Sequence, residues 1–221
     1  MKLKDKAIIV TGSTMGIGEA IARRAVGEGA QVMIHGIESD LAQALAEELS
    51  MPFCAGDVSD PGHCEDLVAA AVGAFGKLDG VVNKAGVVWR NLIEGTDDAF
   101  WDGVMAINAR APLLIIRAAL PHLSASRGAV VNIGSVNAYS GEPNLLAYSA
   151  AKGALMTLTR NLGDTLHRDH GVRVNQINPG WVLSDGERQR KIDEGMDVDW
   201  FEKLDRNTAP SGRSSEPAEC A

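Results

Sequence analysis

Ala7-Ile8-Ile9-Val10-Thr11-Gly12-Ser13-Thr14-Met15-Gly16-Ile17-Gly18 is the stretch of this sequence that decides the fold. The apolar, β-branched residues at its start are typical of a buried strand, and the residues that follow its last glycine have the pattern of a helix. Glycines between a strand and a helix let the backbone approach a phosphate closely, and the helix N-terminus offers it unpaired N–H groups. A plain strand-to-helix turn is the alternative interpretation of this segment taken alone.

Short apolar runs and longer amphipathic stretches alternate along the rest of the chain, which predicts an α/β fold with a parallel sheet flanked by helices. The predicted strands are Lys6–Val10, Gln31–His35, Pro52–Ala55, Gly80–Asn83, Ala129–Ile133 and Val172–Ile177. The predicted helices are Ile17–Glu28, Asp40–Leu49, one from Pro61, a long region from Thr96 to about Leu123 that is interrupted or bent at Pro112, Tyr148–Asp169 and Glu187–Glu194. We expect one domain over residues 1–207, because no linker interrupts the alternation, and a polar tail of loop or disordered structure over residues 208–221.

The composition is that of an ordinary soluble globular protein, with 45% hydrophobic and 23% charged residues. A net charge of −8 argues against non-specific binding to nucleic acid, which requires a basic surface. No apolar run reaches the length that spans a bilayer, so no membrane partner is expected. The three cysteines, Cys54, Cys64 and Cys220, and the five histidines lack metal-ligand spacing. We therefore predict reduced thiols, a cytoplasmic protein and no metal site.

A second group of residues suggests proton chemistry. Tyr148 and Lys152 are four residues apart in a predicted helix, so both side chains can point into one pocket, and Ser135 follows a predicted strand upstream. A tyrosine has a pKa of about 10, and proton transfer near neutrality requires a fall of ~3 units, or about 4 kcal/mol. One positive charge ~4 Å away supplies roughly 4 kcal/mol at an effective dielectric constant of ~20. Each residue also has a plain structural interpretation, Tyr148 as an aromatic at a helix start and Ser135 as a turn residue.

With these motifs the chain resembles the short-chain dehydrogenase/reductase family over residues 6 to about 185. Thr11–Gly18 matches the family pattern T-G-x-x-x-G-I-G, and Asn83-Lys84-Ala85-Gly86 is similar to its N-N-A-G. Further matches in sequence order are Asp57-Val58, Asn108, Ser135, Tyr148, Lys152 and Pro179-Gly180. The resemblance implies a three-layer α/β/α, Rossmann-like, doubly wound parallel sheet. The family normally continues with one more helix and strand, so the last strand of the sheet is expected to be missing.

The resemblance also implies the roles of the site residues. Tyr148 would be the general acid or base, Ser135 would stabilise charge on the same substrate oxygen, and Lys152 would lower the pKa of the tyrosine and contact the nicotinamide ribose. Asn108 would hold a water that links the lysine to solvent, although it could merely mark an irregularity before Pro112. The predicted cofactor-binding residues are Gly12, Thr14, Gly16, Ile17, Gly18, Glu38, Asp57, Val58, Asn83, Ala85, Gly86, Tyr148, Lys152, Pro179, Gly180 and Val182.

NAD(H) and NADP(H) both remain open as cofactors, and we favour NAD(H). Glu38 follows the second predicted strand, where an acid can accept hydrogen bonds from a ribose 2′-hydroxyl and would repel a 2′-phosphate. The segments around Trp89-Arg90, Asn137, Glu142, Leu145 and Trp181 resemble those that line the family's substrate pocket. Arg188, Arg190 and Lys191 could attract an anionic substrate, although mixed charge usually marks an exposed helix.

We therefore expect an oxidoreductase that transfers a hydride between NAD(P) and an alcohol or carbonyl substrate. A 3-oxoacyl reductase and a sugar or polyol dehydrogenase are both open as substrate classes. The alternative is an NAD(P)-binding scaffold or sensor without turnover, motivated by Lys84 at a position where the family has asparagine, and by the short C-terminus. The family associates through the helices predicted here near 97–123 and 148–169, so a homodimer or homotetramer is expected.

Overall fold

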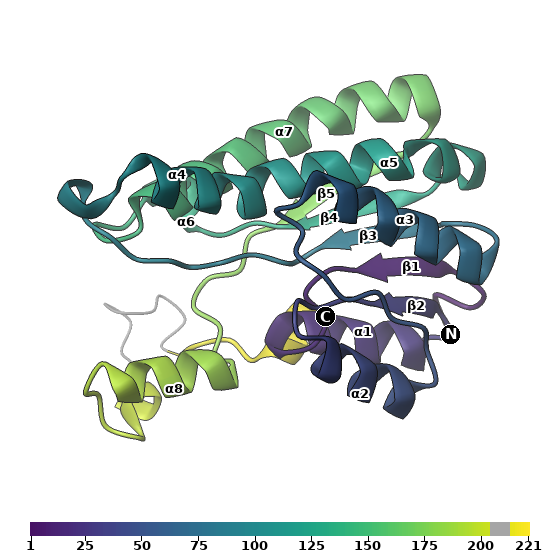
Figure 1. Cartoon of the computed structure of the whole chain (residues 1–221). Helices are drawn as coiled ribbons and strands as arrows, with labels where there is room; N and C mark the ends of the chain where they lie inside the picture. Colours follow the sequence, from purple (N-terminus) through teal and green to yellow (C-terminus); the bar gives the residue numbers. More distant parts are fainter. Residues whose placement is uncertain (204–212) are drawn as a thin grey trace.

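Five parallel strands form the central sheet, in the order β2-β1-β3-β4-β5 (Figure 1). The computed structural model describes residues 1–203 and 213–221, and the count of strands refers to these residues. The strands are β1 (Ala7–Val10), β2 (Gln31–Ile34), β3 (Gly80–Asn83), β4 (Ala129–Ile133) and β5 (Arg173–Ile177). The predicted α/β fold with a doubly wound parallel sheet is confirmed.

Helices cover both faces of this sheet, with α1 and α2 on one side and α3, α5 and α7 on the other (Figure 1). The helices are α1 (Gly16–Gly27), α2 (Ser39–Leu49), α3 (Pro61–Phe75), α4 (Asp98–Met105), α5 (Ala111–Ser126), α6 (Asn137–Ser140), α7 (Leu146–His170) and α8 (Asp185–Asp193). Single 3₁₀ turns form at Ile93–Gly95, Trp200–Lys203 and Pro217–Cys220.

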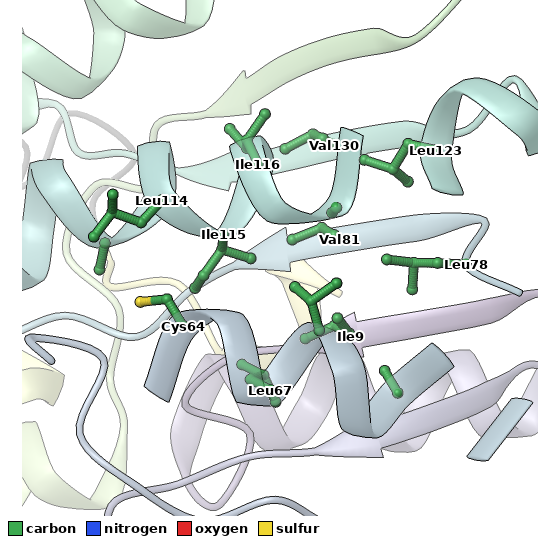
Figure 2. Close-up of a cluster of buried hydrophobic side chains, with 14 of the residues drawn as sticks. Ile9, Cys64, Leu67, Leu78, Val81, Leu114, Ile115, Ile116, Leu123 and Val130 are labelled. Atoms are coloured by element: carbon green, nitrogen blue, oxygen red, sulfur yellow. The ribbon is translucent and has the colours of Figure 1, made fainter. Parts of the chain in front are cut away.

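The core is divided by the alternation of side chains along each strand. A row of buried residues crosses the sheet in register on the α3–α5–α7 side, namely Met33, Ile9, Val81, Val130 and Val174. Figure 2 shows how Leu67 of α3 and Ile115 of α5 pack against this row. The neighbouring residues Ile8 and Val10 of β1 point to the opposite face, where they pack against α1 and α2. Successive side chains of a strand point to opposite faces, so both layers share one sheet.

The strand predicted at Pro52–Ala55 does not form, and this prediction is corrected. The segment makes a single bridge, between Phe53 and Ile34 of β2. Extending the pairing toward the N-terminus would require an N–H donor from Pro52, which proline lacks. Ser50 just before it is in the left-handed conformation that ends α2, so the chain is not extended there.

The long helical region predicted from Thr96 to Leu123 is divided differently from the prediction. It begins at Asp98, after the side chain of Asp97 accepts a hydrogen bond from the backbone N–H of Phe100 at 2.8 Å. The expected bend at Pro112 is instead one wide π-helical turn, Ala106–Arg110, immediately before α5. Length and composition alone would let Asp98–Ser126 cross a membrane, but α5 is a core helix packed against α3.

The end of the chain returns to the body of the molecule. Ser215 pairs with Val182 in an isolated parallel bridge, and the turn Pro217–Cys220 packs against α1. Residues 208–212 of the predicted tail, and residues 204–207 before them, lie outside the described residues. Within the described residues, no further strand of the sheet follows Ile177.

Leu67→Ala should lower the free energy of unfolding by about 2–5 kcal/mol, because it leaves a cavity in the larger core cluster. Leu41→Ala is the matched control, since Leu41 is also on a helix but is 47% exposed. Urea unfolding followed by circular dichroism measures both variants. Equal destabilisation by the two substitutions would contradict this description of the core.

Candidate active site

A cleft opens at the carboxyl edge of the sheet, where the order of the strands reverses. The chain leaves β1 toward β2 on one side, whereas β3 lies on the other side of β1. Ligands of open α/β sheets bind at such a reversal. This glycine cleft has a volume of about 210 Å³. Of the predicted cofactor residues, those that line it are Gly12, Thr14, Glu38, Asp57, Val58, Ala85 and Gly86.

The turn after β1 packs so closely that it leaves no room for side chains at two glycines. A Cβ on Gly18 would lie 2.0 Å from the carbonyl oxygen of Gly12. Gly12 has a φ of +60°, and a Cβ there would lie 2.9 Å from the Cα of Ala85. The hydroxyl of Thr11 donates to the Val82 carbonyl and accepts the N–H groups of Lys84 and Ala85, each at 3.0 Å. The turn is thereby fixed against the loop that follows β3.

Helix α1 presents its first turn toward this cleft without a side-chain cap. Met15 precedes the helix, and its side chain makes no capping hydrogen bond. The uncapped N–H groups and the helix dipole favour an anion at this position. The residues of the cleft therefore fit a phosphate-bearing ligand.

The far end of the cleft carries the two predicted acids. Glu38 is exposed just before α2, and its side chain makes no capping hydrogen bond there. The carboxylate of Asp57 accepts the backbone N–H of Ser59 at 2.8 Å. Both acids are therefore placed where a nucleoside could meet them.

Beneath this end lies a histidine pair that the sequence analysis missed. The Nε2 atoms of His35 and His63 are 3.2 Å apart. The Nδ1 of His35 accepts the N–H of Gly12 at 3.2 Å, so the proton of this ring is on Nε2 and points at His63. Burial, with the nearby charge of His63, lowers the pKa of His35 to about 4. The only sequence signal for His35 is a polar residue at the end of an apolar run.

Other residues of the glycine cleft were also missed as ligand contacts. They are Met15, Gly36, Ile37, Gly56, Lys84, Val87 and Ile107. Lys84 appeared in the sequence analysis only as a departure from N-N-A-G. The others are apolar or glycine residues, in loops except for Ile107 in the π-helical turn, and such residues give no chemical signal in a sequence.

A second cavity, the tyrosine pocket, has a volume of about 650 Å³. It brings together the predicted residues Ser135, Tyr148, Gly180 and Val182 with the predicted substrate residues Arg90, Asn137, Glu142, Leu145, Trp181 and Lys191. Val88, Val136, Glu187, Arg213 and Ser215 also line it and were not predicted. Trp89 points elsewhere and packs against Phe100, with ring centroids 6.0 Å apart.

Tyr148 has a raised pKa in this environment. Burial of the phenol is the main cause, while a hydrogen bond with Ser135 and the charge of Arg90 act in the opposite direction. The ammonium of Lys152 lies 5.7 Å from the centre of the tyrosine ring and donates to the Ile133 carbonyl at 2.8 Å. The groups that shift the pKa of Tyr148 in this structure do not include Lys152, so the lowering of this pKa by Lys152 stays a prediction.

Lys152 is itself a perturbed group, buried in α7. Burial and the charge of Lys84 lower its pKa to about 8. Asn108 lies in the wide turn before α5, where its Nδ2 donates to the carbonyls of Val87 at 3.0 Å and Val104 at 3.1 Å. Its Oδ1 is buried without a partner among the described residues. This leaves an acceptor for a bound water.

The remaining predicted residues do not line either cavity. Asn83 is buried, and its side chain donates to Asn132 at 2.9 Å, within a polar network that continues to Thr159. Gly16 lines a neighbouring cavity beside Leu183. Gly18 packs within the turn, and Ile17 and Pro179 are not among the residues that line the glycine cleft or the tyrosine pocket. No cluster of metal-ligating residues occurs in the part of the chain that the structure describes.

Comparison with known proteins gives a consistent result. A family model described as "short chain dehydrogenase" matches residues 6–195. The 2-(S)-hydroxypropyl-CoM dehydrogenase 3 of Xanthobacter autotrophicus is 38% identical, over 86% of this chain and 77% of the relative. The L-fucose dehydrogenase of Mus musculus is 36% identical, over 100% and 81%. The NADP-dependent (R)-specific alcohol dehydrogenase of Lentilactobacillus kefiri is 31% identical, over 100% and 88%.

The histidine pair predicts a pH dependence of stability. The pKa of His35 is about 4 in the folded protein and ~6.5 when unfolded, so the unfolded state gains a proton first as the pH falls. The contribution of neutral His35 to the free energy of unfolding is therefore present above about pH 6.5 and is lost as the pH falls toward 4. We expect a loss of about 2 kcal/mol between pH 7 and pH 5 from this group.

Urea unfolding at both pH values tests this expectation. His35→Asn keeps an acceptor for Gly12 but cannot titrate, so its loss of stability should be smaller than that of the wild type. His170→Gln changes an exposed histidine at the end of α7 and is the control. The same pH dependence in His35→Asn as in the wild type would refute the assignment.

Proposed function

Because this chain belongs to the short-chain dehydrogenase family, we propose that it is an NAD(P)-dependent oxidoreductase that interconverts a small-molecule alcohol and its carbonyl form. The observation that carries this proposal is the meeting of Ser135 and Tyr148 in one pocket, with Lys152 on the next turn of the same helix. The three relatives described above, all named dehydrogenases, support it.

Two features of the glycine cleft support a dinucleotide ligand, the uncapped start of α1 and the acids at its far end. We assign the diphosphate to the uncapped start of α1, and the adenosine ribose to the end that carries Glu38 and Asp57. When bound, the nicotinamide supplies or accepts the hydride. Tyr148, Lys152, Gly180 and Val182 remain proposed contacts for the nicotinamide half.

Tyr148 is assigned the proton transfer at the substrate oxygen. Its raised pKa keeps the phenol protonated at neutral pH, so the protein alone holds a proton ready for a carbonyl oxygen. Ser135 is hydrogen-bonded to the same phenol and is positioned to stabilise negative charge on that oxygen. A carbonyl group in the tyrosine pocket would thus meet two hydroxyl groups.

Lys152 and Asn108 would resupply the proton. With a pKa of about 8, the Lys152 ammonium can lose a proton at only modest cost. The unpaired Oδ1 of Asn108 could hold a water for this purpose. A scaffold without turnover is not favoured, because such a protein would have no need for Ser135, Tyr148 and Lys152 together.

We also propose a cytoplasmic homo-oligomer whose residues 1–207 form one cofactor-binding and catalytic domain. A groove of about 710 Å³ runs between the region of α4 and α5 and helix α7, and it supports association through these helices. Its apolar lining includes Met105, Leu113 and Leu158. All three cysteines are free thiols, which is consistent with a reducing compartment.

Tyr148→Phe should lower kcat/KM for the carbonyl substrate by ~10²-fold or more, because the general acid is lost. Tyr139→Phe is the matched control, since the chain has only these two tyrosines and Tyr139 is 65% exposed. Turnover is followed by NADH absorbance over a panel of acyl thioesters, sugars and simple ketones. Activity of Tyr148→Phe near that of the wild type would refute the role of Tyr148 as general acid.

NADH should bind more tightly than NADPH, because Glu38 at the ribose end repels a 2′-phosphate. Fluorescence titration measures both dissociation constants. Glu38→Ala should shift the ratio toward NADPH by about tenfold, and Glu47→Ala, on the exposed side of α2, should not change it. Tighter binding of NADPH to the wild type, or an unchanged ratio in Glu38→Ala, would show that Glu38 does not select the cofactor.

A further inference from the structure

Lys84 brings a cation to the start of α1 from another part of the sheet. It is the first residue after β3, and its backbone N–H is held by the hydroxyl of Thr11. Its side chain passes beside Gly18, where an added Cβ would lie 3.0 Å from the lysine Cδ. Its Nζ donates to the carbonyl oxygen of Met15 at 3.3 Å. The ammonium therefore lies beside the residue that precedes the uncapped helix.

The charge of Lys84 is not neutralised by the protein. Burial alone lowers the pKa of this ammonium, and no acidic group acts against that effect. Within residues 1–203 and 213–221, none of the ion pairs involves Lys84, and one of its three donors has a hydrogen-bond acceptor. Lys84 is partly buried, and partial removal of an ammonium from water without an acidic partner is unfavourable. The fold does not require this cost, because an uncharged side chain could fill the same space.

A second cation faces the same region. The charge of Lys84 contributes to the lowered pKa of Lys152, so the two ammonium groups are near enough to repel each other. The loop that carries Lys84 also approaches Lys152, since an added Cβ on Gly86 would lie 3.7 Å from the Lys152 Nζ. Helix α1 adds the positive end of its dipole. Lys84 lines the glycine cleft and Lys152 does not, so the positive groups at the cleft itself are Lys84 and the start of α1, which are suited to an anionic ligand.

We propose that Lys84 is a direct contact for the diphosphate of the bound dinucleotide. This inference rests on the proposed function, because it assumes that the glycine cleft binds NAD(P). An ammonium has three donors and a full charge, and it binds phosphate oxygens as a point charge. The diphosphate would supply the counter-charge that Lys84 lacks among the described residues.

The competing explanation is that Lys84 is a structural tie between β3 and α1 through the Met15 carbonyl. The two explanations differ in their effect on the ligand-free protein. A structural tie stabilises the fold, so its loss would lower the melting temperature. A desolvated cation kept for a ligand destabilises the fold, so an apolar replacement would leave the melting temperature unchanged or raise it.

Lys84→Met is the decisive variant, because methionine fills a similar volume without the charge. We expect its dissociation constants for NADH and for ADP-ribose to rise by about tenfold or more, since both ligands carry the diphosphate. The melting temperature of the ligand-free variant should equal or exceed that of the wild type. Lys84→Gln, which can still donate to Met15, should bind as weakly as Lys84→Met. Lys4→Met removes an exposed cation outside the cleft and is the control.

The outcomes separate this inference from the proposed function. A wild-type protein that binds neither NADH nor NADPH would overturn both. Wild-type binding with Lys84→Met within twofold would overturn the role of Lys84 and leave the function intact. Wild-type affinity in Lys84→Gln would show that the charge is not needed. A melting temperature lowered by several degrees in Lys84→Met would show that the lysine stabilises the fold. Either result would overturn the inference.

Discussion

The site depends on how the end of β1 is held against the loop after β3. The Thr11 hydroxyl makes three hydrogen bonds across this junction, one as donor and two as acceptor. Gly12 and Gly18 then pack without side chains, so the start of α1 lies directly over the turn. A larger residue at either glycine would separate the helix from the strand. The position of the start of α1 and the placement of Lys84 both depend on this contact.

The chemistry of the site follows from what surrounds that junction. Positive groups gather at the start of α1 and along the path to Lys152, whereas the acids Glu38 and Asp57 lie at the far end of the cleft. The pKa of Tyr148 is raised because burial of the phenol outweighs its hydrogen bond with Ser135 and the charge of Arg90. The proposed diphosphate would bring a negative charge to Lys84, which lines the cleft without an acidic partner among the described residues.

Sequence patterns predicted the helices and strands that are determined by residues close together in the chain. Gly80–Asn83 and Ala129–Ile133 were placed at their observed bounds, because short apolar runs between turns leave little choice. The prediction of a strand at Pro52–Ala55 was wrong. Pairing at the edge of a sheet depends on which backbone N–H donors face the neighbouring strand, and this cannot be seen in the segment alone. The burial that raises the pKa of Tyr148 was not predicted, because burial cannot be inferred from the spacing of residues. His35 and the contact of Lys84 with Met15 went unpredicted, since each joins residues far apart in the chain.

The central claim is that the dinucleotide binds at the junction of β1, α1 and the loop after β3. Hydrogen–deuterium exchange of the whole chain, with and without saturating NADH, tests it most directly. The account predicts slower exchange at residues 12–18 and 84–87 in the presence of NADH, because both segments border the diphosphate end of the cleft. Unchanged exchange in these two segments, with protection elsewhere in the chain, would contradict it.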